Sequence, residues 1–250
     1  MDLAIAGKTA LVTGASIGIG RGIALALGDQ GARLAIVARR RELLEETAAE
    51  IARRGGVPPV VIACDFMRED APQTIALEAA AALGEIDILV NNAGGSRRFA
   101  LDSTEEQWAE AMTLNFTRQR QLAHKLLPAM MGKKWGRIVN ITGKSEPEGI
   151  NGAFCAKAAM HSWAKGLSRE VGKYGITVNC IPPGRIMSEQ IERNYAPEYR
   201  QWQSEHEIPV GEYGQPEDVA NLVCFLVSPC ARYITGAVIP VDGGLRRYQF

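Results

Sequence analysis

The chain alternates short apolar runs with longer amphipathic stretches, and this alternation is the feature that most restricts its fold. Runs such as 8–13 and 33–38 predict β-strands, and the longer stretches between the runs predict helices. Strands separated by helices form right-handed βαβ units whose strands are parallel. We therefore predict a Rossmann-type, doubly wound α/β fold with a parallel sheet between two helical layers. The predicted strands cover 8–13, 33–38, 60–64, 86–90, 136–142, 176–181 and 237–241, and the predicted helices cover 20–30, 40–54, 68–83, 103–131, 152–174 and 216–227.

The length of 250 residues fits one α/β domain, so we expect residues 1–250 to form a single domain. Residues 184–215 interrupt the rhythm with several glycines, Pro197, Pro209 and Trp202. Because this stretch follows a predicted strand, it would lie over the carboxyl edge of the sheet. We therefore predict that it forms a substrate lid.

The charge balance and the cysteines exclude several classes of protein. Lys plus Arg number 28 and Asp plus Glu also number 28, without the basic excess usual in nucleic-acid binders. The five cysteines contain no Cys-x-x-Cys pair, which disfavours a disulfide framework and a zinc site. Neither a signal-peptide pattern nor an apolar run of membrane-spanning length stands out. We expect a soluble cytoplasmic protein that binds no metal, membrane or nucleic acid.

A glycine-rich turn joins the first predicted strand to the first predicted helix. Residues 14–20 have the spacing Gly-x-x-x-Gly-x-Gly. Glycines let the backbone approach a phosphate, and the following helix offers free N–H groups and the positive end of its dipole. We predict a pyrophosphate site here, with the Ser16 hydroxyl reaching a phosphate. The Gly-x-Ser-x-Gly pattern of residues 14–18 also matches a nucleophile elbow, but no earlier strand supplies the second oxyanion donor.

The end of the second predicted strand bears on the choice of dinucleotide. NAD-specific sites place an acidic residue here to bind the ribose hydroxyls. This chain has Ala38 followed by Arg39. Because a guanidinium can bind a 2′-phosphate through two hydrogen bonds, we favour NADP over NAD. The alternative is that Arg39 belongs to a solvated helix start.

With these residues in place, the chain resembles the short-chain dehydrogenase/reductase family, particularly its 3-oxoacyl carrier-protein reductase-like members. The resemblance spans nearly the whole chain. It implies a seven-stranded parallel sheet, an NADP or NAD cofactor, a small carbonyl or alcohol substrate, and a homotetramer. The motifs that carry it are TGASIGIG (13–20), Asp65, NNAG (91–94), Asn115 in LNF, GRIVNIT (136–142), Lys157 in CAKAA, GITVNCIPPG (175–184) and ITGAVIPVDGG (234–244).

The resemblance also implies roles for single residues. Asp65 would face the adenine, Lys157 would hold the nicotinamide ribose, and Asn115 would bind the water of the family's proton relay. Asn91, Ala93 and Gly94 would form the floor beside the adenosine ribose. The nicotinamide would lie near Pro183, Gly184, Ile186 and Ser188. The expected cofactor contacts are Gly14, Ser16, Ile17, Gly18, Ile19, Gly20, Arg39, Asp65, Phe66, Asn91, Ala93, Gly94, Lys157, Pro183, Gly184, Ile186 and Ser188.

The two reactive positions of the family do not match. The family's tyrosine stands four residues before its lysine, and that position is Ala153. The family's serine stands six residues after the arginine of the fifth-strand motif, and counting from Arg137 gives Gly143. The tyrosine protonates the substrate oxygen, and loss of a general acid typically costs about 10²–10⁴-fold in rate. The family's mechanism therefore cannot operate here unchanged.

The loop that follows the fifth predicted strand could supply substitutes. Lys144 could donate a proton if burial lowered its pKa, and Ser145 could hydrogen-bond a carbonyl. Glu146 could act as a base or neutralise Lys144, and the alternative is a solvated charged loop. An aromatic cluster in the predicted lid could instead supply a phenol or simply pack the lid; its members are Tyr195, Tyr199, Trp202 and His206.

Other candidates have plainer interpretations. A thiol at Cys155 could act as an acid, but we expect a small buried packing residue. We expect His124 and His161 to be surface or interface residues. Tyr248 and Phe250 in the C-terminal tail would contact a neighbouring subunit.

Three functions remain open. The first is an NADP-dependent oxidoreductase with a relocated proton donor, which has the whole set of cofactor motifs behind it. The second is a lyase, hydratase or isomerase on the same scaffold. The third is a nucleotide-binding protein without catalysis. We favour the first; the sequence does not specify the substrate.

Overall fold

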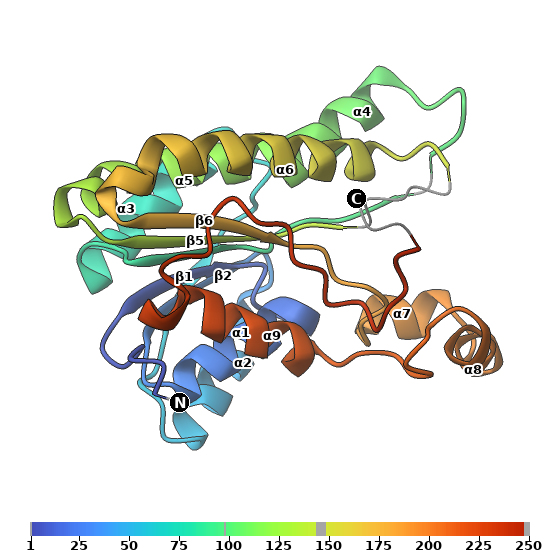
Figure 1. The fold of residues 1–250 in the computed structure, drawn as a ribbon, viewed down its shortest axis with the longest axis horizontal. Helices are drawn as coiled ribbons and strands as arrows, with labels where there is room; N and C mark the ends of the chain where they lie inside the picture. Colours follow the sequence, from blue (N-terminus) through green and yellow to red (C-terminus); the bar gives the residue numbers. More distant parts are fainter. Residues whose placement is uncertain (1, 98, 144–148, 248–250) are drawn as a thin grey trace.

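The computed structural model describes residues 2–97, 99–143 and 149–247. Six parallel strands form one sheet in the order β3-β2-β1-β4-β5-β6 (Figure 1). The sequence continues from β1 outward to β3, then crosses to the other side of β1, which is the doubly wound arrangement predicted above. The strands are β1 (Thr9–Thr13), β2 (Arg33–Ala38), β3 (Val60–Ala63), β4 (Ile88–Asn91), β5 (Gly136–Ile141) and β6 (Ile176–Ile181).

Helices cover both faces of the sheet, so its central strands are apolar on both sides (Figure 1). On β1, Val12 belongs to the core under α1 and α9, whereas Leu11 belongs to the core under α3, α5 and α6. The predicted three-layer fold is therefore confirmed. The helices are α1 (Gly18–Asp29), α2 (Arg41–Arg53), α3 (Ala71–Leu83), α4 (Glu105–Met112), α5 (Arg118–Lys133), α6 (Gly152–Val171), α7 (Glu189–Asn194), α8 (Pro197–His206) and α9 (Pro216–Val227), with short helical turns η1 (Thr113–Thr117), η2 (Gly172–Tyr174) and η3 (Pro229–Ala231).

The expected seventh strand is not formed within the described residues. Residues 237–241 do lie beside β6, where the amide of Cys180 donates to the carbonyl of Ala237 at 2.9 Å and the amide of Ile239 donates to the carbonyl of Cys180. Only isolated bridges result, including Cys180 with Val238 and Pro183 with Val241. The residues predicted as a strand thus lie beside β6, but their pairing is too interrupted to form a strand.

The long helix predicted over 103–131 is interrupted. A capping box begins α4, in which Thr104 accepts from the amide of Gln107 and the Gln107 side chain accepts from the amide of Thr104. The π-helical turn η1 then separates α4 from α5. No residue of α4 is fully buried, whereas α5 buries a stripe that includes Leu122 and Met130.

The segment predicted as an irregular lid contains two helices, α7 and α8. Ser188 caps α7 by accepting from the amide of Ile191, and Pro197 begins α8. Proline in the first turn and a serine cap are the usual signals for helix starts, and the proline was interpreted instead as a sign of irregularity. Figure 1 shows both helices beyond one end of the sheet. Among the described residues, no helix is both long and apolar enough to span a membrane.

Candidate active site

The glycine turn between β1 and α1 is a close-packed backbone cradle. Gly14 and Gly18 have φ angles of +69° and +55°, which favour glycine. A Cβ at Gly20 would lie 2.1 Å from the Gly14 carbonyl oxygen, so only hydrogen fits there. The side chain of Asn92, just beyond β4, donates to the carbonyls of Thr13 and Gly14, both at 3.1 Å. The cradle is therefore held in shape from two strands.

The start of α1 suits a phosphate. Its N-cap residue is Ile17, which has no side-chain hydrogen-bond group to offer the first-turn amides. Those amides and the positive end of the helix dipole point to the cradle, where an anion could satisfy them. The tight glycine geometry and the open helix start together fit the pyrophosphate of a dinucleotide.

The next strands supply the residues expected around the adenosine. Ala38 ends β2, and the exposed Arg39 follows it at the pocket wall. Beyond β3, Asp65 is exposed and accepts from the amide of Met67 at 3.0 Å, while the ring of Phe66 is buried. The glycine cradle, the Arg39 guanidinium and the Asp65 carboxylate thus line the same pocket.

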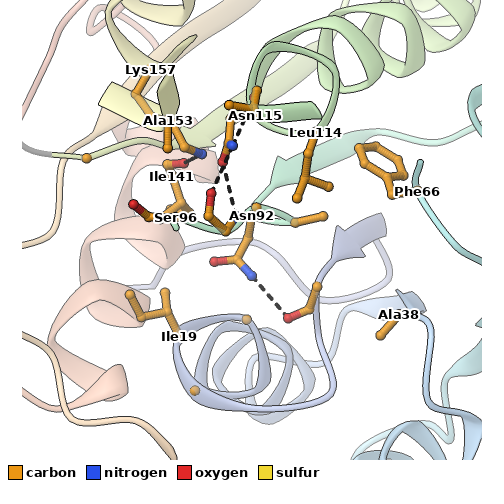
Figure 2. Close-up of a pocket in the computed structure, with 18 of the residues that line it drawn as sticks. Ile19, Ala38, Phe66, Asn92, Ser96, Leu114, Asn115, Ile141, Ala153 and Lys157 are labelled. Atoms are coloured by element: carbon orange, nitrogen blue, oxygen red, sulfur yellow. Dashed lines mark hydrogen bonds between the residues drawn. The ribbon is translucent and has the colours of Figure 1, made fainter. Parts of the chain in front are cut away.

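One pocket of about 600 Å³ joins these groups to the end of β5 (Figure 2). It is large enough for a small-molecule or cofactor site. Ile19 and Ala38 lie near one end of the view, and Lys157 and Ala153 near the other. The expected residues that line it are Gly14, Ser16, Ile17, Gly18, Ile19, Gly20, Arg39, Asp65, Phe66, Ala93, Gly94, Asn115, Lys157, Pro183, Ile186 and Ser188.

Two expected contacts lie outside this lining. Asn91 is fully buried and donates to the side chain of Asn140 at 2.9 Å, below the pocket. Its neighbour Asn92 lines the pocket instead. Gly184 packs against the C-terminal segment, since a Cβ there would lie 2.6 Å from the Cα of Asp242. The buried hydrogen bond of Asn91 and the close packing of Gly184 therefore explain why neither residue lines the pocket.

Lys157 is the central charge at the reactive end. It rises from α6 with 8% of its surface exposed, and its Nζ donates to the carbonyl of Ile141 at 2.8 Å. Burial lowers the pKa of the Lys157 ammonium to about 8. The nearby Cys180 offsets this only in part, because burial raises the pKa of its own thiol to about 12. The Lys157 ammonium therefore gives up its proton more readily than that of an exposed lysine.

The π-helical turn η1 brings Asn115 beside Lys157. The Oδ1 of Asn115 accepts from the amide of Gly95, and its Nδ2 donates to the carbonyls of Gly95 and Ala111. Gly94 lies against both groups, since a Cβ there would stand 2.8 Å from Asn115 Oδ1 and 3.3 Å from Lys157 Nζ. Irregular π turns are common at functional sites because they re-aim one side chain.

No phenol or hydroxyl stands at the family's two reactive positions. Ala153 lines the pocket one helical turn before Lys157, and Gly143 lines it at the end of β5. The described lining contains no tyrosine. Lys144 and Ser145, predicted as substitutes, lie outside the described residues, as do Glu146, Tyr248 and Phe250.

Several apolar side chains line the pocket in addition to Ala153. Phe99, Leu114 and Phe154 line it, and Phe99 packs edge-on against Trp108 with centroids 4.8 Å apart. Asn151 fastens this wall to α6: its Oδ1 caps the helix, and its Nδ2 donates to Ser96 Oγ and the Arg97 carbonyl. This region has room for an organic substrate next to Lys157.

Three predictions about other candidates need correction or comment. Cys155 is exposed rather than buried, because it faces outward from α6. His161 is not a plain surface residue: its Nε2 lies 2.7 Å from Thr142 Oγ1, and burial, Arg246 and Lys157 lower the pKa of its imidazole. His124 is exposed, as expected, and lies beside Trp163.

The aromatic cluster of the predicted lid does not line the pocket. Its four rings stack in sequence from Tyr195, just after α7, along α8, with neighbouring centroids 5.0–5.9 Å apart. None of Tyr195, Tyr199, Trp202 and His206 is among the described residues of the lining. The described residues also contain no group of three or more His, Cys, Asp or Glu that could hold a metal ion.

Sequence reasoning missed several lining residues. Asn92 stands in the quoted NNAG motif, so its amide could have been recognised as a clamp for the glycine turn. Thr142 ends the quoted GRIVNIT motif, but its pairing with His161 spans 19 residues and carries no local signal. Phe99 and Phe154 converge only after folding.

Comparisons with known proteins agree with this geometry. Residues 14–246 match the family described as enoyl-(acyl carrier protein) reductase. The 3-oxoacyl-(acyl-carrier-protein) reductase FabG of Aquifex aeolicus is 34% identical over 256 residues, covering 98% of this chain and 100% of that protein. L-sorbose reductase from Gluconobacter frateurii, solved with NADPH and L-sorbose, has a TM-score of 0.92 at 30% identity and covers 99% and 100% of the two chains. A 7α-hydroxysteroid dehydrogenase solved with NADH also has a TM-score of 0.92, at 31% identity over 97% and 96%.

Proposed function

This chain belongs to the short-chain dehydrogenase/reductase family, and we propose that it is an NADP-dependent oxidoreductase that interconverts a small carbonyl compound and its alcohol. The observation that carries the proposal is the continuous pocket that runs from the glycine cradle to Lys157 and Asn115. A dinucleotide-dependent reductase needs one end of such a pocket to bind the cofactor and the other end to hold the reacting carbonyl. A cytoplasmic homotetramer is part of the same proposal.

Each part of the chain has a role in this reaction. When bound, the reduced nicotinamide supplies a hydride to the carbonyl carbon. The glycine cradle and the start of α1 bind the pyrophosphate, and Lys157 and Asn115 lie where the nicotinamide ribose and a proton relay belong in the family. Phe99, Leu114 and Phe154 hold the apolar part of the substrate and exclude water from it.

Arg39 supports NADP over NAD. It is an exposed guanidinium at the pocket wall, and Ala38 offers no carboxylate to the ribose hydroxyls. We expect Arg39→Ala to weaken NADPH binding about tenfold with little effect on NADH, because a hydrogen bond to a charged group contributes about 1.5–3 kcal/mol. Calorimetry measures both affinities. Arg41→Ala is the matched control, since Arg41 is exposed, pairs with Glu45 and lies outside the lining.

Cofactor absorbance tests the reaction itself. NADPH and the purified protein are mixed with a panel of ketones, ketoses and 3-oxoacyl thioesters, the substrate classes suggested by the relatives above. Oxidation of NADPH by at least one carbonyl supports the proposal. Tight NADPH binding without turnover on any of them contradicts it and favours a nucleotide-binding protein without catalysis, which Ala153 and Gly143 would also suit.

A further inference from the structure

The ammonium of Lys157 has unused hydrogen-bonding capacity. A lysine ammonium carries three N–H donors. Within the described residues, one of them is bonded, to the carbonyl of Ile141 at 2.8 Å. Nζ lies against Gly94, which lines the pocket, as does Lys157 itself. At least one donor is therefore available to a ligand in the pocket.

Only a methyl group stands where the family's phenol would separate this ammonium from a substrate. Ala153 lies one turn before Lys157 on α6, and Figure 2 shows the two side chains next to each other, with Ile141 and Asn115 close by. Neither Ala153 nor Gly143 carries a polar side-chain atom. A substrate oxygen in this space lies at the end of the pocket that Lys157 lines, and Lys157 is the cationic donor among the described lining residues there.

We infer that Lys157 is itself the catalytic acid, and that it delivers a proton from Nζ directly to the substrate oxygen. This inference rests on the carbonyl reduction proposed above. As the carbonyl carbon accepts the hydride from the reduced nicotinamide, the C=O π electrons move to oxygen. The Nζ–H bond breaks and its proton forms the alcohol O–H. Lysine is left as a neutral amine, and water returns the proton.

The groups packed around Lys157 suit this role because those described are uncharged or cationic. Cys180 on β6 keeps its proton, His161 on the same helix is held neutral by burial, and Asn115 and Thr142 are neutral. Arg246 adds positive charge beyond His161. No carboxylate among the described residues raises the pKa of Lys157. An ammonium with a pKa of about 8 is protonated at neutral pH, yet gives up its proton more readily than an ordinary lysine of pKa about 10.4.

The first test distinguishes proton donation by Lys157 from the effect of its positive charge. Lys157→Arg keeps the positive charge but cannot release a proton. Since Lys157 also lies where the nicotinamide ribose belongs, we expect NADPH binding by calorimetry to weaken, and kcat at saturating NADPH to fall at least 100-fold. Lys165→Arg is the control, since Lys165 is exposed on the same helix. A Lys157→Arg enzyme that keeps kcat within threefold overturns the inference and leaves the proposed function standing.

The second test restores a donor. In the double variant Ala153→Tyr/Lys157→Arg, a phenol is available and the cation is retained. We expect at least a tenfold recovery of kcat over Lys157→Arg, and no recovery with Ala153→Phe/Lys157→Arg. Equal behaviour of the tyrosine and phenylalanine double variants means that Lys157 acts by positioning, and overturns the inference.

Two measurements need no arginine variant. The kcat for reduction by the unaltered enzyme should fall tenfold per pH unit above about pH 8, because the acid must be protonated. In the cofactor-free protein labelled with ¹⁵N-lysine, the Nζ signal lost in Lys157→Met should titrate near the same pH. A rate that is flat to pH 10, or an Nζ still protonated there, contradicts the inference. Absence of any carbonyl reduction overturns the proposed function, and the inference with it.

Discussion

The two ends of the pocket differ in how much space they leave for an added side-chain atom. At the phosphate end, three glycines and Asn92 allow almost no change, since a Cβ at Gly20 or Gly14 would meet backbone within 3 Å. At the reactive end, Gly143 would accept a Cβ at 3.7 Å from Lys157 Cγ, an ordinary contact. Binding geometry is therefore fixed by backbone, whereas the chemistry depends on a few side chains that can be exchanged. Substitutions at each end of the pocket test this difference.

The largest effect is expected at the phosphate end. Gly20→Ala forces a methyl group against the Gly14 carbonyl and the Asn92 amide. Since overpacking costs about 1–3 kcal/mol, we expect dinucleotide binding to weaken about 10–100-fold and the melting temperature to fall. Calorimetry and thermal denaturation measure the two. Gly132→Ala on α5, where nothing lies within 4 Å, should instead stabilise the protein by about 0.5–1 kcal/mol. Similar behaviour of the two variants would contradict the cradle.

An intermediate effect is expected at the reactive end. Ala153→Tyr adds a phenol one turn before Lys157, and a positioned general acid contributes about 10²–10⁴-fold. Because Lys157 already supplies part of that, we expect a gain in kcat of about tenfold, with NADPH affinity little changed. Ala153→Phe tests the ring without the hydroxyl and should show no gain. If neither variant gains activity while both remain folded, the pocket differs from the family's in more than this position.

The smallest effect concerns His161. Burial, followed by Arg246 and Lys157, lowers the pKa of its imidazole in the folded state, so folding favours the neutral form. The stabilisation that comes from neutral His161 is present above about pH 6.5, the ordinary pKa of an imidazole in the unfolded chain. It is lost as the pH falls below that value. We expect urea unfolding to show the wild type losing up to about 1 kcal/mol more than His161→Gln between pH 7.5 and 5.5. Identical losses would mean that His161 titrates normally.

The same contrast describes what the sequence could predict. Strand–helix alternation and the glycine turn are local signals, so the three-layer fold and most of the cradle were expected correctly. The break at η1 was missed because Leu114 and Phe116 continue an amphipathic pattern that gives no sign of a wider turn. A strand at residues 237–241 was expected, but the chain there pairs with β6 and the segment after it only through isolated bridges.

Long-range contacts explain the remaining differences. His161 was interpreted as a surface residue because nothing near it in sequence marks Thr142 as its partner. Cys155 was expected to be buried from its residue type alone, but its position on α6 turns it outward. Counting from motifs identified Ala153 and Gly143, yet only the folded chain shows that both line the same pocket as Lys157.

The π turn η1 has a further consequence for how this protein tolerates mutation. The extra residue in this turn rotates α5 out of phase with α4. Gln107, Glu110 and Ala111 on α4 line the pocket and none is fully buried, whereas α5 supplies side chains to the core. Exchanges along α4 should therefore alter substrate preference at little cost in stability, while exchanges along α5 should do the reverse. A single deletion within residues 113–117 would couple the two again.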